Sequence, residues 1–263
     1  MAARVLPVFG LLTAVLLSCP AGAAAVAQGK SWSEIAKLPD FTTGIFEVAA
    51  TAADRASETQ LSLTPAYAAM LQAYQDRKKA GDEQDTPNAN CVPTGMPGIM
   101  SPPFPIQFLY SPGQVVILFE VYSQSRHIYT DGRAHPIDPD LTFNGHSIGH
   151  WEGDTLVVDT VGISPETPLS SGTRAQNFGV RHSDKLHIIE RMRLTDPETL
   201  LVETTVEDPE ALAKPWKHTR TFKRHRDWTL AEYVCQQNNR DRLDENGHAS
   251  VDLTPPLPAG IAK

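Results

Sequence analysis

Acid–base chemistry is the first activity that the sequence suggests, because imidazole and carboxyl groups gather in the stretch GHSIGHWEGDTLVVDTVG, residues 145–162. A tight turn at Glu152-Gly153 would fold this stretch into a β-hairpin, with glycine supplying the positive φ that such turns need. That turn places His146 directly opposite Asp159 on the neighbouring strand. A histidine oriented by a carboxylate can transfer protons near neutral pH, so the hairpin is a candidate catalytic element.

The alternation of side chains along a strand decides what this pair can do. In the predicted hairpin, His146 and Asp159 share one face, whereas Trp151, Leu156 and Val158 share the other. If the histidine face lines a cavity, the low dielectric strengthens the pair and shifts both titrations. If the tryptophan face packs into the core, the pair lies at the surface and contributes little. The functional interpretation depends on the first arrangement.

A second acidic residue, Glu190, lies in the apolar run KLHIIERMRL. It alternates with neighbours that would share its face of a strand, namely Leu186, Ile188, Met192 and Leu194. A carboxylate in such a row either pairs with a cation, such as Arg126, or is kept protonated by desolvation. Glu190 is therefore either one half of a buried ion pair or a catalytic acid or base.

The histidines also allow a metal site. His146 and His150 lie on one face of the same predicted strand, and His182, Asp184 and His187 follow close together in the sequence. Imidazole and carboxylate ligands of this kind bind zinc and similar metals, but the spacing lacks the specificity of a helical HExxH motif. We expect no cofactor, and a metal-dependent hydrolase remains an alternative.

The composition of the chain limits the classes of partner that it can bind. The chain has 263 residues, of which 41% are hydrophobic, and 23 basic against 31 acidic residues give a net charge of -8. This charge disfavours nucleic acid and anionic membranes as partners. No GxSxG elbow, phosphate-binding glycine loop or dinucleotide fingerprint is present. The expected partner is a small molecule, and the oligomeric state is left open.

The first 27 residues have the layout of a secretory signal. A single arginine, Arg4, precedes the apolar run 5–17, and small residues end at Ala27, which is the expected cleavage site. Lipoprotein processing at Cys19 is the alternative. No segment reaches the roughly 20 apolar residues of a membrane span. The sequence thus predicts a periplasmic or secreted protein that is not inserted in the membrane.

Two cysteines, Cys91 and Cys235, follow the predicted signal. An exported protein reaches a compartment in which thiols oxidise, so we expect a disulfide between them. A reactive thiol is the competing interpretation, and it would require a base beside an unpaired cysteine.

The elements that must position these groups are mostly strands. A first strand is expected within residues 41–48, and a helix between Thr64 and Gly81, followed by a long proline-rich loop packed on the core. From Gln114 to Cys235 short strands alternate with turns, and the last pair is expected at 216–223 and 228–235. We predict one antiparallel, lipocalin-like barrel domain at 28–240, with a β-sandwich as the alternative and an extended tail at 241–263.

Four segments resemble an uncharacterised family of exported bacterial proteins. They are WEGDTLVVDTVG, HSDKLHIIERMR, VEDPEALAKPW and EYVCQQNNR, and the resemblance spans residues 41–240. It implies a shared fold and a shared site region, without an activity that can be transferred. The positions that match the family are Arg126, Tyr129, His146, Asp159, His182, Glu190 and Arg191.

We therefore expect a cofactor-independent lyase or isomerase that acts on an apolar, aromatic or polycyclic small molecule. The candidate catalytic residues are His146, Asp159, His182 and Glu190, and the candidate substrate-binding residues are Arg126, Tyr129, Trp151 and Arg191. In this interpretation Arg126 or Tyr129 holds a developing oxyanion. A carrier that binds such a molecule without changing it is the alternative, because barrels of this shape serve both purposes.

Overall fold

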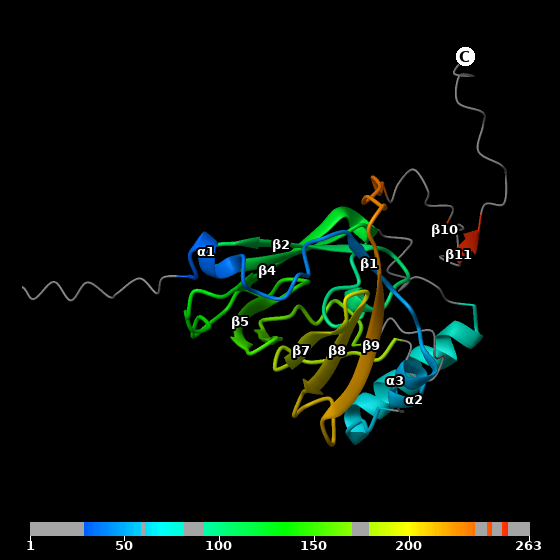
Figure 1. Cartoon of the computed structure of the whole chain (residues 1–263). Coiled ribbons are helices and arrows are strands. Elements are labelled where there is room, and N and C mark those ends of the chain that lie inside the picture. The colour runs from blue at the N-terminus through cyan, green and yellow to red at the C-terminus, as the bar shows by residue number, and fades with distance from the viewer. Residues whose placement is uncertain are drawn as a thin grey trace, which may run out of the picture.

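The fold is a closed β-barrel, seen in a computed structural model that describes residues 29–58, 61–81, 92–169 and 179–234 and the strands at 241–243 and 249–251. The barrel strands follow one another in chain order around the wall (Figure 1). The predicted mostly-β barrel is confirmed, and the sandwich alternative is wrong. The expected signal at 1–27 lies outside the described residues.

Neighbouring strands of the barrel are antiparallel except at one position. The barrel strands are β1 (Ile45–Val48), β2 (Ile106–Ser111), β3 (Gln114–Phe119), β4 (Gln124–Tyr129), β5 (His146–Glu152), β6 (Thr155–Val161), β7 (His187–Asp196), β8 (Thr199–Glu207) and β9 (Trp216–His225). β1 pairs with both β2 and β9, which closes the barrel. β4 and β5 are parallel, so the expectation of a wholly antiparallel sheet was wrong here. In the predicted tail, β10 (Asp241–Leu243) and β11 (Ala249–Val251) form a separate pair.

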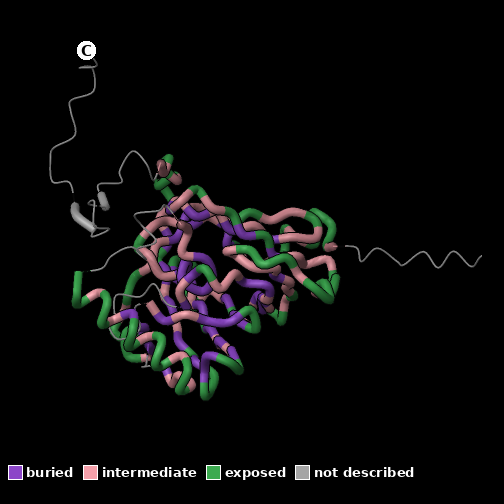
Figure 2. Tube along the Cα trace, turned by 180° about the vertical axis from the view of Figure 1, so that it is seen from behind, coloured by how far each residue is buried: buried purple, intermediate pink, exposed green. Residues whose placement is uncertain are grey.

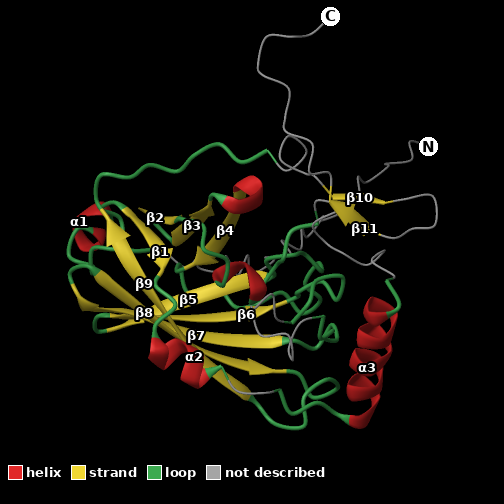
Figure 3. Cartoon of the chain, turned by 90° about the vertical axis from the view of Figure 1, so that its right-hand side faces the viewer, coloured by secondary structure: helices red, strands yellow, loops and turns green. Residues whose placement is uncertain are grey.

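Helices are few and lie outside the barrel wall (Figure 3). They are α1 (Trp32–Ile35), α2 (Ala52–Ser57) and α3 (Pro65–Lys79), with 3-10 turns η2 (Gly98–Met100) and η3 (Val121–Ser123). α3 is the predicted helix, with Pro65 in its first turn. α2 packs on β9, where Thr221 donates a 2.9 Å hydrogen bond to Asp54.

The core fills the inside of the barrel, and buried residues run through its centre in Figure 2. Met96, Ile99 and Met100 from the proline-rich segment are buried, which confirms that this segment packs on the core. The same segment also contains β2, which the sequence analysis missed. Its residues 106–111 lie between Pro105 and Pro112 and contain no proline, so they can pair with β3.

The β5–β6 hairpin turns at Gly153-Asp154 instead of Glu152-Gly153. His146 therefore pairs with Val161, two residues beyond the predicted Asp159. A shift of two residues preserves the faces of both strands, because side chains alternate with a period of two. The division into two faces was correct, but the predicted pairing was wrong.

Trp151 belongs to the inner face of this hairpin. Its ring lies 5.6 Å from Phe41 and 5.9 Å from Tyr110, centroid to centroid, and Leu156 opposite it is fully buried. His146 and Asp159 consequently point outward. The expectation that they line a hollow inside the barrel was wrong, because the apolar side chains of the opposite face, among them Trp151 and Leu156, pack toward the interior.

The end of the barrel also differs from the expectation. Residues 226–234 contain no strand, and β9 pairs instead with β8 and β1. Both Cys91 and Cys235 lie outside the described residues, so their disulfide remains a prediction.

Burial makes His218 a determinant of stability at low pH. Desolvation, reinforced by the positive charge of Arg220, lowers the pKa of His218 to about 3. Unfolded histidine titrates near 6.5, so the unfolded chain binds the additional proton between these two values. Stability then falls as the pH drops through this window, by up to about 1.4 kcal/mol per pH unit. Urea unfolding at several pH values should show a shallower slope for His218→Phe.

The matched control for this measurement is Trp216→Phe. Trp216 stacks on His218 with a centroid distance of 4.2 Å, so its replacement changes the same packing without removing a titrating group. An unchanged slope in His218→Phe would contradict the assignment.

Candidate functional site

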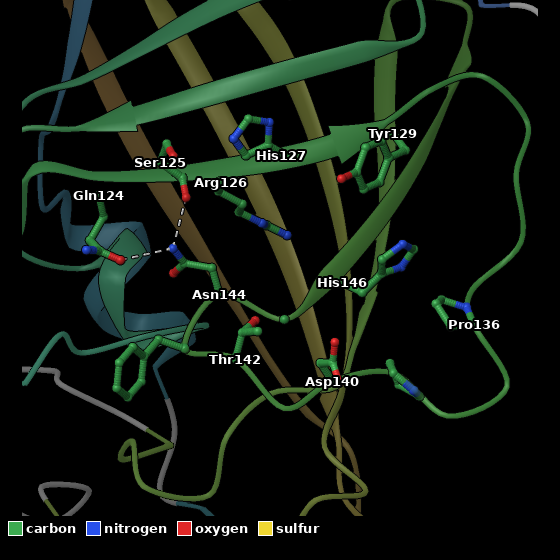
Figure 4. A pocket seen from close by; sticks show the side chains of 13 residues that line it. Gln124, Ser125, Arg126, His127, Tyr129, Pro136, Asp140, Thr142, Asn144 and His146 are labelled. Carbon is green, nitrogen blue, oxygen red and sulfur yellow. Dashed lines mark hydrogen bonds between the residues drawn. The ribbon is translucent and has the colours of Figure 1, made fainter.

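A pocket of about 440 Å³ opens between β4 and the segment that leads into β5. β4 and β5 pair only at Ile128–Ser147 and Tyr129–Ile148. Before this short contact, β4 and the segment that leads into β5 are not paired, and the pocket lies between them. Figure 4 shows the lining side chains, among them Arg126, Tyr129, Asp140, Asn144 and His146. Arg126 is the one buried residue in the lining. The volume is in the range of small-molecule sites.

His146 stands at the start of a chain of hydrogen-bonding groups on the outer face of the barrel. Its Nδ1 lies 2.8 Å from Nδ1 of His135, which comes from the loop between β4 and β5. The Nε2 of His135 lies 3.2 Å from Oδ1 of Asp159 on β6. Asp159 thus reaches His146 through a second imidazole instead of by the direct contact that the sequence predicted.

For the state in which both rings are neutral, the tautomers follow from Asp159. A carboxylate only accepts hydrogen bonds, so His135 must carry its proton on Nε2. Its Nδ1 is then an acceptor, and the proton of His146 must be on Nδ1. We assign these protons from the network. The assignment leaves the lone pair on Nε2 of His146, an atom without a hydrogen-bond partner in the described part of the chain.

The surroundings of His146 favour its neutral form. Desolvation lowers the pKa of His146, and the positive charge that His135 and Arg133 can carry lowers it further. Tyr129 stacks on the imidazole with a centroid distance of 5.4 Å, and the guanidinium of Arg133 lies 3.9 Å from the centroid of the Tyr129 ring. An unprotonated imidazole at neutral pH is the form that a general base requires.

Glu190 and Arg126 form a buried ion pair inside the barrel. Nη2 of Arg126 lies 2.5 Å from Oε2 of Glu190, and both side chains are 1% exposed. Arg126 also donates to Ser147 at 3.1 Å and to Thr160 at 2.8 Å. The ion-pair interpretation of Glu190 is confirmed, and its partner is the arginine named from the sequence. Together with Ser147 and Thr160, the pair joins four consecutive strands, β4 to β7.

Three predicted site residues lie elsewhere. His182 is buried in the loop before β7, with Nδ1 2.8 Å from the carbonyl oxygen of Ser183 and Nε2 3.2 Å from the hydroxyl of Thr167. Arg191 forms an exposed ion pair with Glu152 at 2.8 Å. Trp151, as described, is partly buried and packs against the core. None of these three side chains belongs to the lining of the pocket, and their contacts are structural.

The sequence analysis missed His135. No periodicity positions this residue, since it lies between the turn Asp131-Gly132 and Pro136 in a loop. The available signal was local: a lone histidine beside prolines, shortly before His146. His187 was considered only as a metal ligand, although its ring also contacts Asp159.

Two further features concern metal ions and membranes. Among the described residues, no group of three or more His, Cys, Asp or Glu side chains is arranged to hold a metal ion. No described helix is both long enough and apolar enough to cross a membrane.

In comparisons with known proteins, the chain matches no family model and no curated protein.

The burial of the Arg126–Glu190 pair predicts that two Glu→Gln substitutions lower the free energy of unfolding by very different amounts. Glu190→Gln leaves the charge of Arg126 uncompensated in the interior, which should lower the free energy of unfolding by about 3–5 kcal/mol. Glu152→Gln breaks a comparable but exposed pair with Arg191 and should cost less than about 1 kcal/mol. Urea unfolding measures both values.

A double variant separates charge from packing. Arg126→Met with Glu190→Leu removes both charges and keeps apolar volume, so it should be more stable than Glu190→Gln alone. Equal stability losses for Glu190→Gln and Glu152→Gln would show that the pair is not buried as described.

Proposed function

We propose that the protein is an exported enzyme that transfers protons to and from a small molecule bound in the pocket between β4 and β5. A lyase or isomerase fits best, with His146 as the general base. One observation carries the proposal: His146 lines the pocket, and its Nδ1 is held by a histidine that a carboxylate orients in turn. Such an arrangement of base and orienting groups is typical of acid–base catalysis.

The proposed reaction begins at Nε2 of His146, which removes a proton from the substrate. The positive charge that forms on the ring is stabilised through Nδ1–H by His135, and Asp159 balances the charge at the far end. In an isomerisation the same proton returns to another substrate atom. In an elimination the electron pair of the broken bond expels a leaving group, and the proton is released.

Negative charge that develops on a substrate oxygen would be stabilised by Arg126 and Tyr129. Arg126 lies beneath the pocket as one half of a formally neutral ion pair, so it would act as a preorganised dipole, and electrostatic stabilisation by such groups is often the largest catalytic contribution. Glu190 acts in this proposal through Arg126, which it positions. It does not serve as a second acid, because Arg126 holds its carboxylate and Glu190 is not part of the pocket lining.

The lining favours an apolar substrate with a few polar groups. Tyr129, Phe143, Pro136 and Pro139 offer apolar and aromatic surface, whereas Asn144 adds an amide. Aromatic or polycyclic compounds agree with this composition. The ion pair of Arg126 is formally neutral, so the pocket has no strong bias toward anionic substrates.

A two-step experiment tests the proposal. Neutral aromatic dimers, terpenoids and steroids are screened for a rise in melting temperature, which reports binding to the folded state. Each binder is then incubated with the protein in D₂O, and mass spectrometry detects product or deuterium incorporation. We expect His146→Gln to retain binding and to lose about 10²–10⁴-fold in rate.

The matched control is His150→Gln, because His150 lies on the same strand and the same outer face but contacts Glu152. It should keep the wild-type rate. Binding without any chemical change in the wild type would support the carrier alternative. Turnover that survives His146→Gln would remove His146 from the mechanism, and turnover abolished by a chelator and restored by zinc would favour the metal-dependent hydrolase.

A further inference from the structure

We infer that the pocket holds its substrate by a neutral carbonyl group, whose oxygen accepts a hydrogen bond from the backbone N–H of His127 on β4. The inference rests on the proposed function and names the class of substrate. That class is an apolar ketone, ester or lactone in which the carbon deprotonated by His146 is bonded to the carbonyl carbon.

One edge of β4 is only partly paired. Toward β3 the strand pairs along its whole length, from Gln124 to Tyr129. Toward β5 it pairs only at Ile128 and Tyr129. The first half of β4, residues 124–127, therefore has an unpaired backbone edge, and the pocket lies along it (Figure 4). Unpaired strand edges present backbone groups that can bind a partner.

Two hydrogen bonds show which backbone groups face this edge. The N–H of Thr130 donates to the carbonyl oxygen of Gly113, which directly precedes β3, at 2.8 Å. On the opposite side, Nδ2 of Asn144 donates to the carbonyl oxygen of Ser125 at 3.1 Å (Figure 4). Backbone groups of successive strand residues point to opposite sides, so Ser125 and His127 both face the pocket.

This edge offers hydrogen-bond donors to a ligand. The carbonyl oxygen of Ser125 is already bonded to Asn144. Within the described part of the chain, the N–H groups of Ser125 and His127 have no hydrogen-bond partner. A main-chain donor that lacks a protein partner binds water or a ligand, and the ligand group must be an acceptor.

The surroundings favour a neutral acceptor in a small molecule. Asp140 brings a negative charge to the lining, which disfavours a carboxylate, and the ion pair of Arg126 is formally neutral. Asn144 occupies the place beside Ser125 that the backbone of an added strand would take, so an extended peptide cannot pair along the edge. Among neutral acceptors, a carbonyl oxygen suits a backbone N–H best.

His127 is the donor closer to the proposed base. Tyr129, the next residue on the same edge, lies roughly 7 Å further along the strand. Its ring stacks on His146 with a centroid distance of 5.4 Å. His127 and His146 both line the pocket of about 440 Å³, so one small molecule can contact the two residues together.

The hydrogen bond becomes stronger during the proposed reaction. Nε2 of His146 takes a proton from the carbon beside the carbonyl group. The electrons of the broken C–H bond form a C=C bond, and the π electrons of the carbonyl group move to its oxygen. The N–H of His127 then donates to an enolate oxygen, and it is preorganised because β3 holds β4 in place. Return of the proton to carbon, or loss of a leaving group from the next carbon, restores the carbonyl group.

The experiment compares two probes that differ in the carbonyl group, 2-tetralone and tetralin. Each is titrated into ¹⁵N-labelled protein up to its solubility limit, and ¹H–¹⁵N spectra follow the backbone amides. With 2-tetralone the amide proton of His127 should move downfield in a saturable manner, because a new hydrogen bond deshields it. Tetralin should not produce this shift. The amides of Arg126 and Ile128 are the internal controls, because they face β3.

His127→Pro removes the N–H, and an unpaired edge tolerates proline. It should weaken binding of 2-tetralone about three- to tenfold and leave binding of tetralin unchanged. His127→Ala is the matched variant, because it keeps the N–H, and it should retain the preference for the ketone. If His127→Pro does not fold, the amide shift in the wild type decides.

Equal shifts of the His127 amide with both probes, or no saturable shift with 2-tetralone, would overturn the inference. Deuterium uptake by 2-tetralone in D₂O, measured above the rate without protein, separates the inference from the proposed function. If the amide shifts but uptake is not accelerated, the carbonyl site stands and the proposed function fails. If His146-dependent uptake occurs without the shift, the proposed function stands and the carbonyl site fails.

Discussion

The buried ion pair between Arg126 and Glu190 is the constraint on which the rest of the structure depends. A charged group inside a barrel requires a partner and further hydrogen bonds, and Ser147 and Thr160 supply them. The four residues come from β4, β5, β6 and β7, so their contacts fix these strands relative to one another. They also hold β5 against β4 where backbone pairing is short. The pocket opens beside this junction, and Arg126 lies beneath it.

Strand alternation then determines where chemistry can occur. Since Ser147 and Thr160 face inward to complete the ion-pair network, His146 and Asp159 must face outward. The outer face is where a loop can reach them, and His135 from the β4–β5 loop joins the two. The interior of the barrel provides stability and a fixed ion pair, whereas the proposed acid–base groups lie on the outside, at the margin of the pocket.

Much of this arrangement could be predicted from the sequence, as far as it depends on local patterns. Turn residues and alternation indicated the barrel class and the two faces of the β5–β6 hairpin. They left Glu190 either as the partner of a cation such as Arg126 or as a catalytic acid or base. The inward face could not be chosen from the pattern, because Ile148 and Val157 make the outer face apolar as well. The hairpin register could not be predicted, because Glu152-Gly153 and Gly153-Asp154 could each form the two-residue turn. The parallel contact of β4 with β5 and the position of His135 depend on a long loop, for which the sequence has no periodicity.

The central claim is that Asp159, acting through His135, leaves the lone pair of His146 on Nε2. The ¹⁵N chemical shifts of the His146 ring at neutral pH test it most directly, because protonated and unprotonated imidazole nitrogens have well-separated shifts. Our account predicts a protonated Nδ1 and an unprotonated Nε2 in the wild type. A His146 ring that carries its proton on Nε2 at neutral pH would contradict it.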